Sequence, residues 1–183
     1  MRRVLVSGVL AVLLLAACSH PSSSGPTGPT GPVLPSPGAV NATQTPLLPT
    51  SRFALPQLDG GQFQELLGQL RGTPVIVNIW ASWCGPCKAE APVLRTAARR
   101  YGTRIQFLGL DVQDQRAPAQ EFIRDFGWSY PSVFDPTNAV HTSLGVVGQP
   151  VTLFFDRKGQ RVATHAGPIT QQALSQAIRS IQH

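Results

Sequence analysis

The sequence predicts an α/β fold in which helices flank a central mixed sheet. Three apolar stretches have the length and residue types of buried strands, at residues 75–81, 105–110 and 151–155. Helix-like stretches follow the first two, as in β–α units with parallel strands. The third ends at a turn, Asp156-Arg157-Lys158-Gly159, and the chain returns through residues 162–165 as an antiparallel strand. Parallel and antiparallel pairing are therefore expected in one sheet.

The remaining elements follow from local signals. Residues 53–63 have strand-like residues around Asp59-Gly60-Gly61, which predicts an N-terminal hairpin. Apolar residues at helical spacing predict the helices, and the fourth of these ends at Gly145. The helices are expected at residues 65–70, 88–101, 118–126, 138–144 and 169–181, with a further short strand at 130–134.

A pair of cysteines, Cys84 and Cys87, lies where the first strand gives way to a helix. Two intervening residues place both sulfurs within disulfide reach on the first helical turn. The first sulfur faces the unpaired N–H groups and positive dipole of the helix N-terminus, which favour a thiolate. Because the thiolate is the reactive form, Cys84 is the predicted nucleophile and Cys87 the resolving thiol. The pair is itself the redox group, so no further cofactor is expected.

A cysteine pair of this spacing has two other known uses, in a structural disulfide and in a zinc site. A structural disulfide gains most from closing a long loop, and this loop has only two residues. A zinc site needs two more ligands. The chain has no second cysteine pair, and His141 and His165 belong to no ligand motif. Redox exchange through a Cys84–Cys87 disulfide is therefore favoured, and no metal is expected.

The active-site string carries a family resemblance. Trp83-Cys84-Gly85-Pro86-Cys87 after a buried strand resembles the thioredoxin active site. The longer string at residues 77–92 resembles the TlpA/ResA/DsbE-type thiol–disulfide oxidoreductases, which are extracytoplasmic and membrane-tethered. The resemblance extends over residues 52–182. It implies a thioredoxin fold with an N-terminal hairpin and an inserted helix and strand between residues 111 and 136.

The same resemblance implies a substrate-binding surface. In this fold family a cis-proline lies beside the cysteine pair, and Pro150 matches it. A cis bond exposes the preceding backbone, at Gln149, to an extended substrate. Trp83 is expected to contact substrates, and Gly85 and Pro86 complete the surface.

Glu90 and Asn78 form the subtler part of the predicted site. Thioredoxin has a buried acid at the position of Asn78, and an asparagine cannot titrate. Glu90 lies three residues after Cys87 and hence on nearly the same helix face. We hypothesise that Glu90 is a partly buried carboxylate that assists proton movement at Cys87; the alternative is a solvated helix glutamate.

The direction of electron flow remains open at this stage. Gly85-Pro86 matches thioredoxin, which favours a reductase. The resemblance further implies exported thiol or disulfide proteins as partners, apocytochrome c among them, and a membrane thiol-transfer protein as electron donor. An oxidase for exported proteins and a redox-inert binding lipoprotein are the alternatives. A peroxidase is disfavoured by the vicinal cysteine spacing. We expect a monomer.

The N-terminus resembles a lipoprotein signal. Residues 1–17 comprise a cationic start and an apolar stretch that is too short for a permanent membrane span. Leu15-Ala16-Ala17-Cys18 resembles a bacterial lipobox, which implies cleavage and lipidation at Cys18. An ordinary signal peptide or an uncleaved anchor is the alternative. Residues 18–51 predict a disordered tether rich in Pro, Gly and Ser, ahead of a domain at 52–183. The domain is therefore expected outside the cytoplasm, anchored to the cell membrane by lipid.

The charge of the chain is mildly basic, with 15 Lys and Arg against 9 Asp and Glu. The basic residues form no cluster with interleaved aromatic residues. This pattern predicts a solvated surface, and binding of nucleic acid is not expected.

Overall fold

The computed structural model describes residues 45–182. The predicted signal peptide, Cys18 and most of the tether lie outside the described residues, as does His183. Helices and strands follow one another in this order: α1 (Gly60–Gln69), β1 (Val75–Trp80), α2 (Gly85–Tyr101), β2 (Gln106–Val112), α3 (Arg116–Asp125), β3 (Ser132–Asp135), α4 (Ala139–Ser143), β4 (Val151–Phe155), β5 (Arg161–Ala166) and α5 (Gln171–Ile181).

The strands form one mixed sheet in the order β3-β2-β1-β4-β5. β1 pairs in parallel with β2, and β2 with β3. β4 pairs antiparallel with β1 and with β5. All six residues of β1 are buried, as expected for a central strand covered on both faces. The predicted mixed α/β sheet is confirmed.

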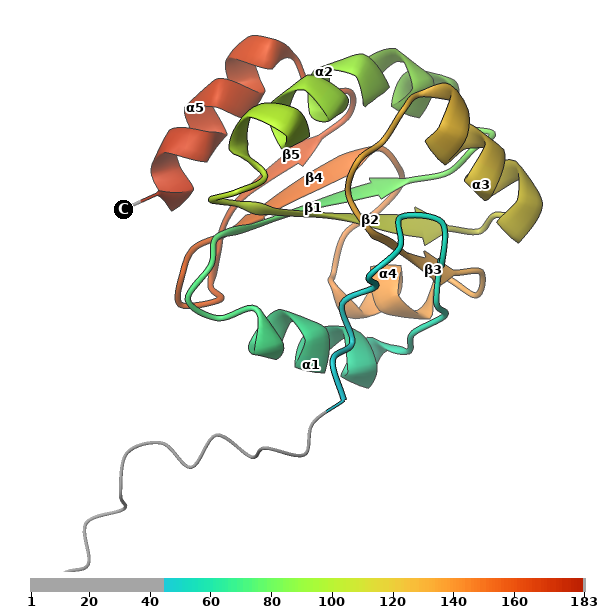
Figure 1. Cartoon of the computed structure of the whole chain (residues 1–183), viewed down its shortest axis with the longest axis horizontal. Helices are drawn as coiled ribbons and strands as arrows, with labels where there is room; N and C mark the ends of the chain where they lie inside the picture. Colours follow the sequence, from blue (N-terminus) through green and yellow to red (C-terminus); the bar gives the residue numbers. More distant parts are fainter. Residues whose placement is uncertain (1–44, 183) are drawn as a thin grey trace, which may run out of the picture. The chain divides into compact units, whose positions relative to one another are not determined.

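Two layers of helices cover the sheet (Figure 1). Helices α2, α3 and α5 lie on one face, and α1 and α4 lie on the other. Alternation along β1 divides the core accordingly: Ile76 and Trp80 pack under α2, whereas Val77 and Ile79 pack toward α1. The cysteine pair begins α2, directly beyond the end of β1.

The predicted N-terminal hairpin is wrong. Asp59 does not open a turn between strands but caps α1: its carboxylate accepts the N–H of Gln62 at 2.8 Å, and Gln62 accepts the N–H of Asp59 at 3.0 Å. This reciprocal pair is a capping box, which satisfies two helix N–H groups. Among the described residues before α1, only Gln57 pairs with a strand: it forms an isolated parallel bridge with Phe134 on the edge strand β3.

The other elements agree with the predictions, with shifted ends. α2 begins at Gly85 because Cys84 is its N-cap. The predicted inserted helix and strand are α3 and β3. Trp80 lies in the core, as predicted, and Trp128 packs edge-on against it with ring centroids 4.8 Å apart. Leu47, which the sequence analysis assigns to the tether, packs against the core on the α1 side. Within residues 45–182 no helix is long and apolar enough to span a membrane.

Candidate active site

The cysteine pair occupies the start of α2. Cys84 has extended backbone angles as the N-cap, and its Sγ accepts the N–H of Cys87 at 3.2 Å. Pro86 in the first turn suits this position, because a helix start needs no N–H there. The two cysteines form a disulfide with Cα atoms 5.2 Å apart. Cys87 is fully buried and Cys84 is 4% exposed, while Gly85 and Pro86 are exposed beside them.

Trp83 forms one side of the surface around the pair. Its side chain is 56% exposed, and its Nε1 donates to the carbonyl of Gln113 at 3.0 Å. This bond orients the indole across the loop that follows β2. A surface pocket of about 270 Å³ opens here, lined by Ser82, Trp83, Gln113, Asp114, Gln115 and Pro118.

The loop before β4 forms another wall. Val147 is 92% exposed, and the peptide bond between Gln149 and Pro150 is cis, as the resemblance implies. His141 is buried, and its Nε2 lies 3.1 Å from the carbonyl oxygen of Gly148, so it anchors this loop from beneath. A pocket of about 510 Å³ lies along the loop, lined by Gln113, Asn138, His141, Thr142 and residues 145–149. Gln113 borders both pockets.

The register of the sheet places Pro150 beside the cysteine pair. Ile79, near the end of β1, is opposite Val151, so the residue before Val151 lies where β1 leads into the 81–84 loop. Pro150 is buried there, and its carbonyl accepts the N–H of Gly167 at 2.9 Å. The sequence-predicted substrate-binding residues Gln149 and Pro150 therefore lie at the same end of the sheet as the loop that carries Trp83 and the cysteine pair.

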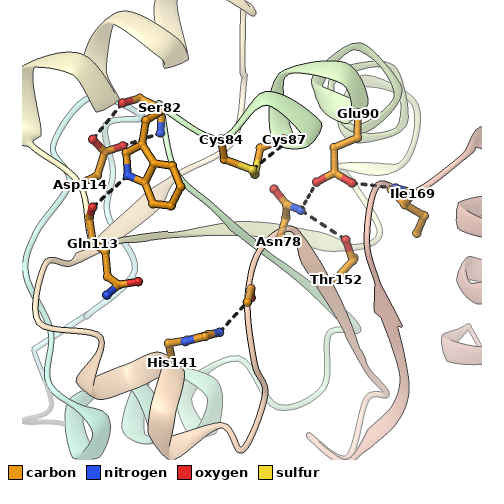
Figure 2. The surroundings of a disulfide bond; sticks show 12 residues. Asn78, Ser82, Cys84, Cys87, Glu90, Gln113, Asp114, His141, Thr152 and Ile169 are labelled. Carbon is orange, nitrogen blue, oxygen red and sulfur yellow. Dashed lines mark hydrogen bonds between the residues drawn. A yellow bond between two sulfur atoms is a disulfide. The ribbon is translucent and has the colours of Figure 1, made fainter.

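Glu90 is held in a buried polar cluster beneath α2 (Figure 2). Its side chain is 2% exposed. Asn78 Nδ2 donates to Oε1 at 2.8 Å, and the N–H of Ile169 donates to Oε2 at 2.7 Å. Asn78 also lies 3.3 Å from Thr152 Oγ1, on the neighbouring strand. The alternative of a solvated helix glutamate is therefore wrong.

Burial dominates the titration of Glu90. Removal from water raises the pKa of its carboxyl group to about 7, although the hydrogen bonds from Ile169 and Asn78 act in the opposite direction. Burial also raises the pKa of Tyr130, and the charge of Glu90 adds to that shift. A carboxyl group that titrates near neutrality one helical turn from Cys87 can accept or release a proton there.

Two further acids lie at the end of β2. Asp114 accepts the N–H of Ser82 at 2.5 Å and its hydroxyl at 2.8 Å, which ties the loop before Cys84 to the loop after β2. Asp111 is fully buried, and burial together with the charge of Asp114 raises its pKa to about 9. Sequence reasoning missed both acids and Ser82. The signal was the string Asp111-Val112-Gln113-Asp114 at the carboxyl end of a parallel strand.

The chemistry of the site rests on sulfur, carboxyl and backbone groups. Within residues 45–182, His, Cys, Asp and Glu side chains nowhere gather in the groups of three or more that could hold a metal ion. His165 lies on β5, with its Nε2 3.4 Å from the carbonyl oxygen of Pro168. The arrangement provides a dithiol, a buried titratable acid and an apolar rim.

Known proteins are similar to this chain in sequence and in fold. A model of the AhpC/TSA family matches residues 48–163. The thiol:disulfide interchange protein DsbE of Escherichia coli (strain K12) is 32% identical over 135 residues, which cover 73% of this chain and 71% of DsbE. The thiol-disulfide oxidoreductase ResA of Geobacillus thermodenitrificans is 28% identical over 131 residues, covering 71% of this chain and 74% of ResA.

Solved structures agree with these relatives. A DsbF homologue from Corynebacterium diphtheriae superposes with a TM-score of 0.58 at 30% identity, over 62% of this chain and 75% of that protein. The family match at residues 48–163 includes the strand, the cysteine pair and the helix described above. The chain therefore belongs to the AhpC/TSA family of thioredoxin-like proteins and is a thiol–disulfide oxidoreductase of the DsbE and ResA type.

Proposed function

We propose that the protein reduces disulfides in exported proteins, with Cys84 as nucleophile and Cys87 as resolving thiol. The observation that carries the thiol exchange, with Cys84 as its nucleophile, is the position of Cys84 Sγ at the N-terminus of α2, where it accepts the N–H of Cys87. In the reduced protein, the same N–H and the helix dipole stabilise a thiolate on Cys84. Cys87 is fully buried, whereas Cys84 is 4% exposed.

The reaction takes place in two exchanges. The Cys84 thiolate attacks one sulfur of the substrate disulfide, forms a mixed disulfide and releases the other substrate sulfur as a thiolate. The Cys87 thiolate then attacks Cys84 Sγ, which breaks the mixed disulfide and releases the second substrate thiolate. The substrate gains two electrons and, with solvent, two protons. The protein is left with the Cys84–Cys87 disulfide.

Glu90 is proposed to serve the second exchange. Cys87 is buried, so its proton has no direct route to bulk water. Glu90 lies on the next turn of α2 on the same buried side, and its pKa of about 7 lets it accept that proton at neutral pH. Asn78 and Ile169 hold the two carboxylate oxygens in place.

Electrostatics favours the reducing direction. Dithiols become oxidants when their reduced, thiolate form is strongly stabilised. Here Gly85 and Pro86 carry no charge that would add to the stabilisation of the thiolate by the helix N-terminus. The carboxylate of Glu90 opposes a second negative charge on Cys87 and so raises the free energy of the ionised dithiol. Both features favour a more reducing dithiol.

Partners and location complete the proposal. We propose that lipid on Cys18 anchors the protein outside the cytoplasmic membrane, and that the tether between Cys18 and Leu47 gives the domain reach. The substrates are exported disulfide proteins, with oxidised apocytochrome c as the leading example. A membrane thiol-transfer protein would return electrons to the Cys84–Cys87 disulfide.

Trapping tests the assignment of the two thiols. A Cys87→Ser variant stops after the first exchange, so it should accumulate mixed disulfides through Cys84 in cells. A Cys84→Ser variant is the matched control and should accumulate none. Equal, background levels in both variants would support a redox-inert binding protein.

The mass of the mature N-terminus tests lipidation, since an unmodified Cys18 thiol in the native host would contradict it.

The reduction potential tests the direction. Equilibration of the Cys84–Cys87 pair against glutathione buffers should give a reduction potential of about −270 mV, as for thioredoxin, which is at the reducing end of the range for such cysteine pairs. A value near about −120 mV would instead assign the protein as an oxidase. Trapping would succeed in either case, so the two experiments separate the chemistry from its direction.

A further inference from the structure

Asp111 is a buried carboxyl group without a donor. It lies at the end of β2, opposite Trp80 on β1 and Phe134 on β3. The residue is 0% exposed, and neither oxygen accepts a hydrogen bond. A carboxylate left in this state would lack both water and donors, which is strongly unfavourable. The neutral acid avoids that penalty because it carries a proton that it can donate.

Asp114 provides the acceptor. Its Oδ1 accepts from the hydroxyl of Ser82 at 2.8 Å and from the N–H of Gln115 at 2.7 Å. Its Oδ2 accepts from the N–H of Ser82, which leaves a lone pair on that oxygen. Asp111 and Asp114 are within hydrogen-bonding reach of each other. Two carboxyl groups in contact repel each other when both are ionised. One of them therefore keeps its proton and donates it to the other in a hydrogen bond.

The contacts of Asp114 hold the loop that leads into Cys84, the N-cap of α2. Ser82 lies two residues before Cys84, and the segment between is held by the Ser82 contacts and by the bond from Trp83 Nε1 to Gln113. Figure 2 shows Ser82 and Asp114 next to each other, to the left of Cys84 in this view. Any shift of Asp114 therefore moves the loop that aims Cys84 Sγ at the N–H of Cys87.

We propose that Asp111 is a positioning residue for the reactive thiol: its carboxylic acid donates to Asp114, and Asp114 thereby holds Ser82 and the loop that leads into Cys84. This inference rests on the proposed role of Cys84 as nucleophile. Asp111 touches neither substrate nor sulfur and acts only through Asp114.

The charged groups that act on Asp111 give the arrangement a pH dependence. Burial, first, and then the charge of Asp114 and a hydrogen bond with it raise the pKa of Asp111, Arg116 at the start of α3 lowers it, and the result is a pKa of about 9. Arg116 itself lies over the ring of Phe134 and donates to the carbonyl of Leu55. As pH rises through about 9, Asp111 loses its donor and repels Asp114.

Two variants separate the donor from the charge. Asp111→Asn keeps an N–H donor for Asp114 and is neutral at every pH, whereas Asp111→Leu keeps the branching at Cγ, with larger methyl groups in place of the oxygens, and has no donor. Both are made in the Cys87→Ser background, so that Cys84 is the only thiol of the domain. The readout is the rate at which reduced Cys84 reacts with 2,2′-dipyridyl disulfide from about pH 5 to about pH 10, across the range in which thiols and the buried acid titrate.

We expect Asp111→Asn to retain the rate at neutral pH and Asp111→Leu to be about five-fold slower, as for the loss of one hydrogen bond. In the Cys87→Ser parent the rate should rise with pH as the Cys84 thiolate forms, and should then fall as pH passes about 9. Asp111→Asn should abolish that fall. Equal profiles for the parent and Asp111→Asn would overturn the inference, even if Asp111→Leu does not fold. If Cys84 of the parent does not react at all, the proposed function fails instead.

Discussion

Asn78 Nδ2 lies 2.8 Å from Oε1 of Glu90, so an amide that cannot titrate is paired with a carboxyl group whose pKa is about 7. In the sheet, Asn78 is opposite Thr152 on one side and Gly109 on the other. The donor therefore comes from the centre of the sheet and the acid from the helix above it. Because Glu90 can ionise and Asn78 cannot, the pair carries at most one negative charge. The pH dependence of the pair therefore follows the ionisation of Glu90.

Stability should fall as pH rises toward neutrality. Glu90 binds its proton more tightly in the folded state, with a pKa of about 7, than in the unfolded chain, where the ordinary value is 4.5. The native state therefore binds more protons between these values. Its free energy of unfolding should drop by about 3 kcal/mol across that window and level off above pH 7. Glu90→Gln should remove this drop. Urea unfolding of the oxidised protein measures it, and parallel curves for both proteins would contradict the shift.

Glu90→Gln should also slow the second exchange. The amide cannot take the proton of Cys87, and general-base assistance is typically worth about 10²-fold or more. In the wild type, release of the second substrate thiol should speed up as pH rises through about 7, where Glu90 ionises. In the variant that rise should move to the higher pH at which Cys87 itself ionises. Single-turnover release from a preformed mixed disulfide measures this step. Unchanged kinetics between about pH 5 and 8 would reject the role of Glu90.

Asn78→Asp should destabilise the protein in a pH-dependent way. The new carboxyl group replaces the donor to Glu90 and Thr152 with a second acid. At pH 5 both acids can be neutral, and the loss should be small. At pH 8 a charge must remain buried without its partner, so we expect a loss of about 3 kcal/mol or more. Thr152→Val is the control, because it removes only a 3.3 Å contact and adds no charge. An equal loss at both pH values would contradict this account.

Much of the fold was predictable because its signals are local. The apolar residues of β1, the cysteine spacing and the helical periodicity of α2 all lie within one short stretch. The hairpin error was also local: Asp59-Gly60-Gly61 suits a turn, but Gln62 completes a capping box, and that competing signal decided the structure.

The missed parts of the site depend on contacts between distant segments. Ser82 and Asp114 are 32 residues apart in the chain, and Glu90 and Ile169 are 79 residues apart. No periodicity or short motif relates such positions. The cis bond before Pro150 came from the resemblance, because a proline before a strand does not by itself indicate one. Burial of an unpaired acid at Asp111 also required the packed structure.

Trp83→Ala should weaken reduction of protein substrates but not of small disulfides. The indole is 56% exposed beside Cys84, and its Nε1 is held by Gln113, so it offers a fixed apolar surface to a docking chain. Loss of such a contact is worth about 1–2 kcal/mol, or roughly 5- to 30-fold in kcat/KM. The measurement compares kcat/KM for a disulfide-bonded protein with the rate toward oxidised glutathione.

Val162→Ala provides the matched control for Trp83. Val162 is also an exposed large hydrophobic residue, but it lies on the edge strand β5 and lines neither pocket beside the cysteine pair. Both rates should remain at the wild-type level in this variant. If Trp83→Ala slowed glutathione and the protein substrate equally, the indole would be acting on Cys84 through the Gln113 contact and the loop, and not as a docking surface.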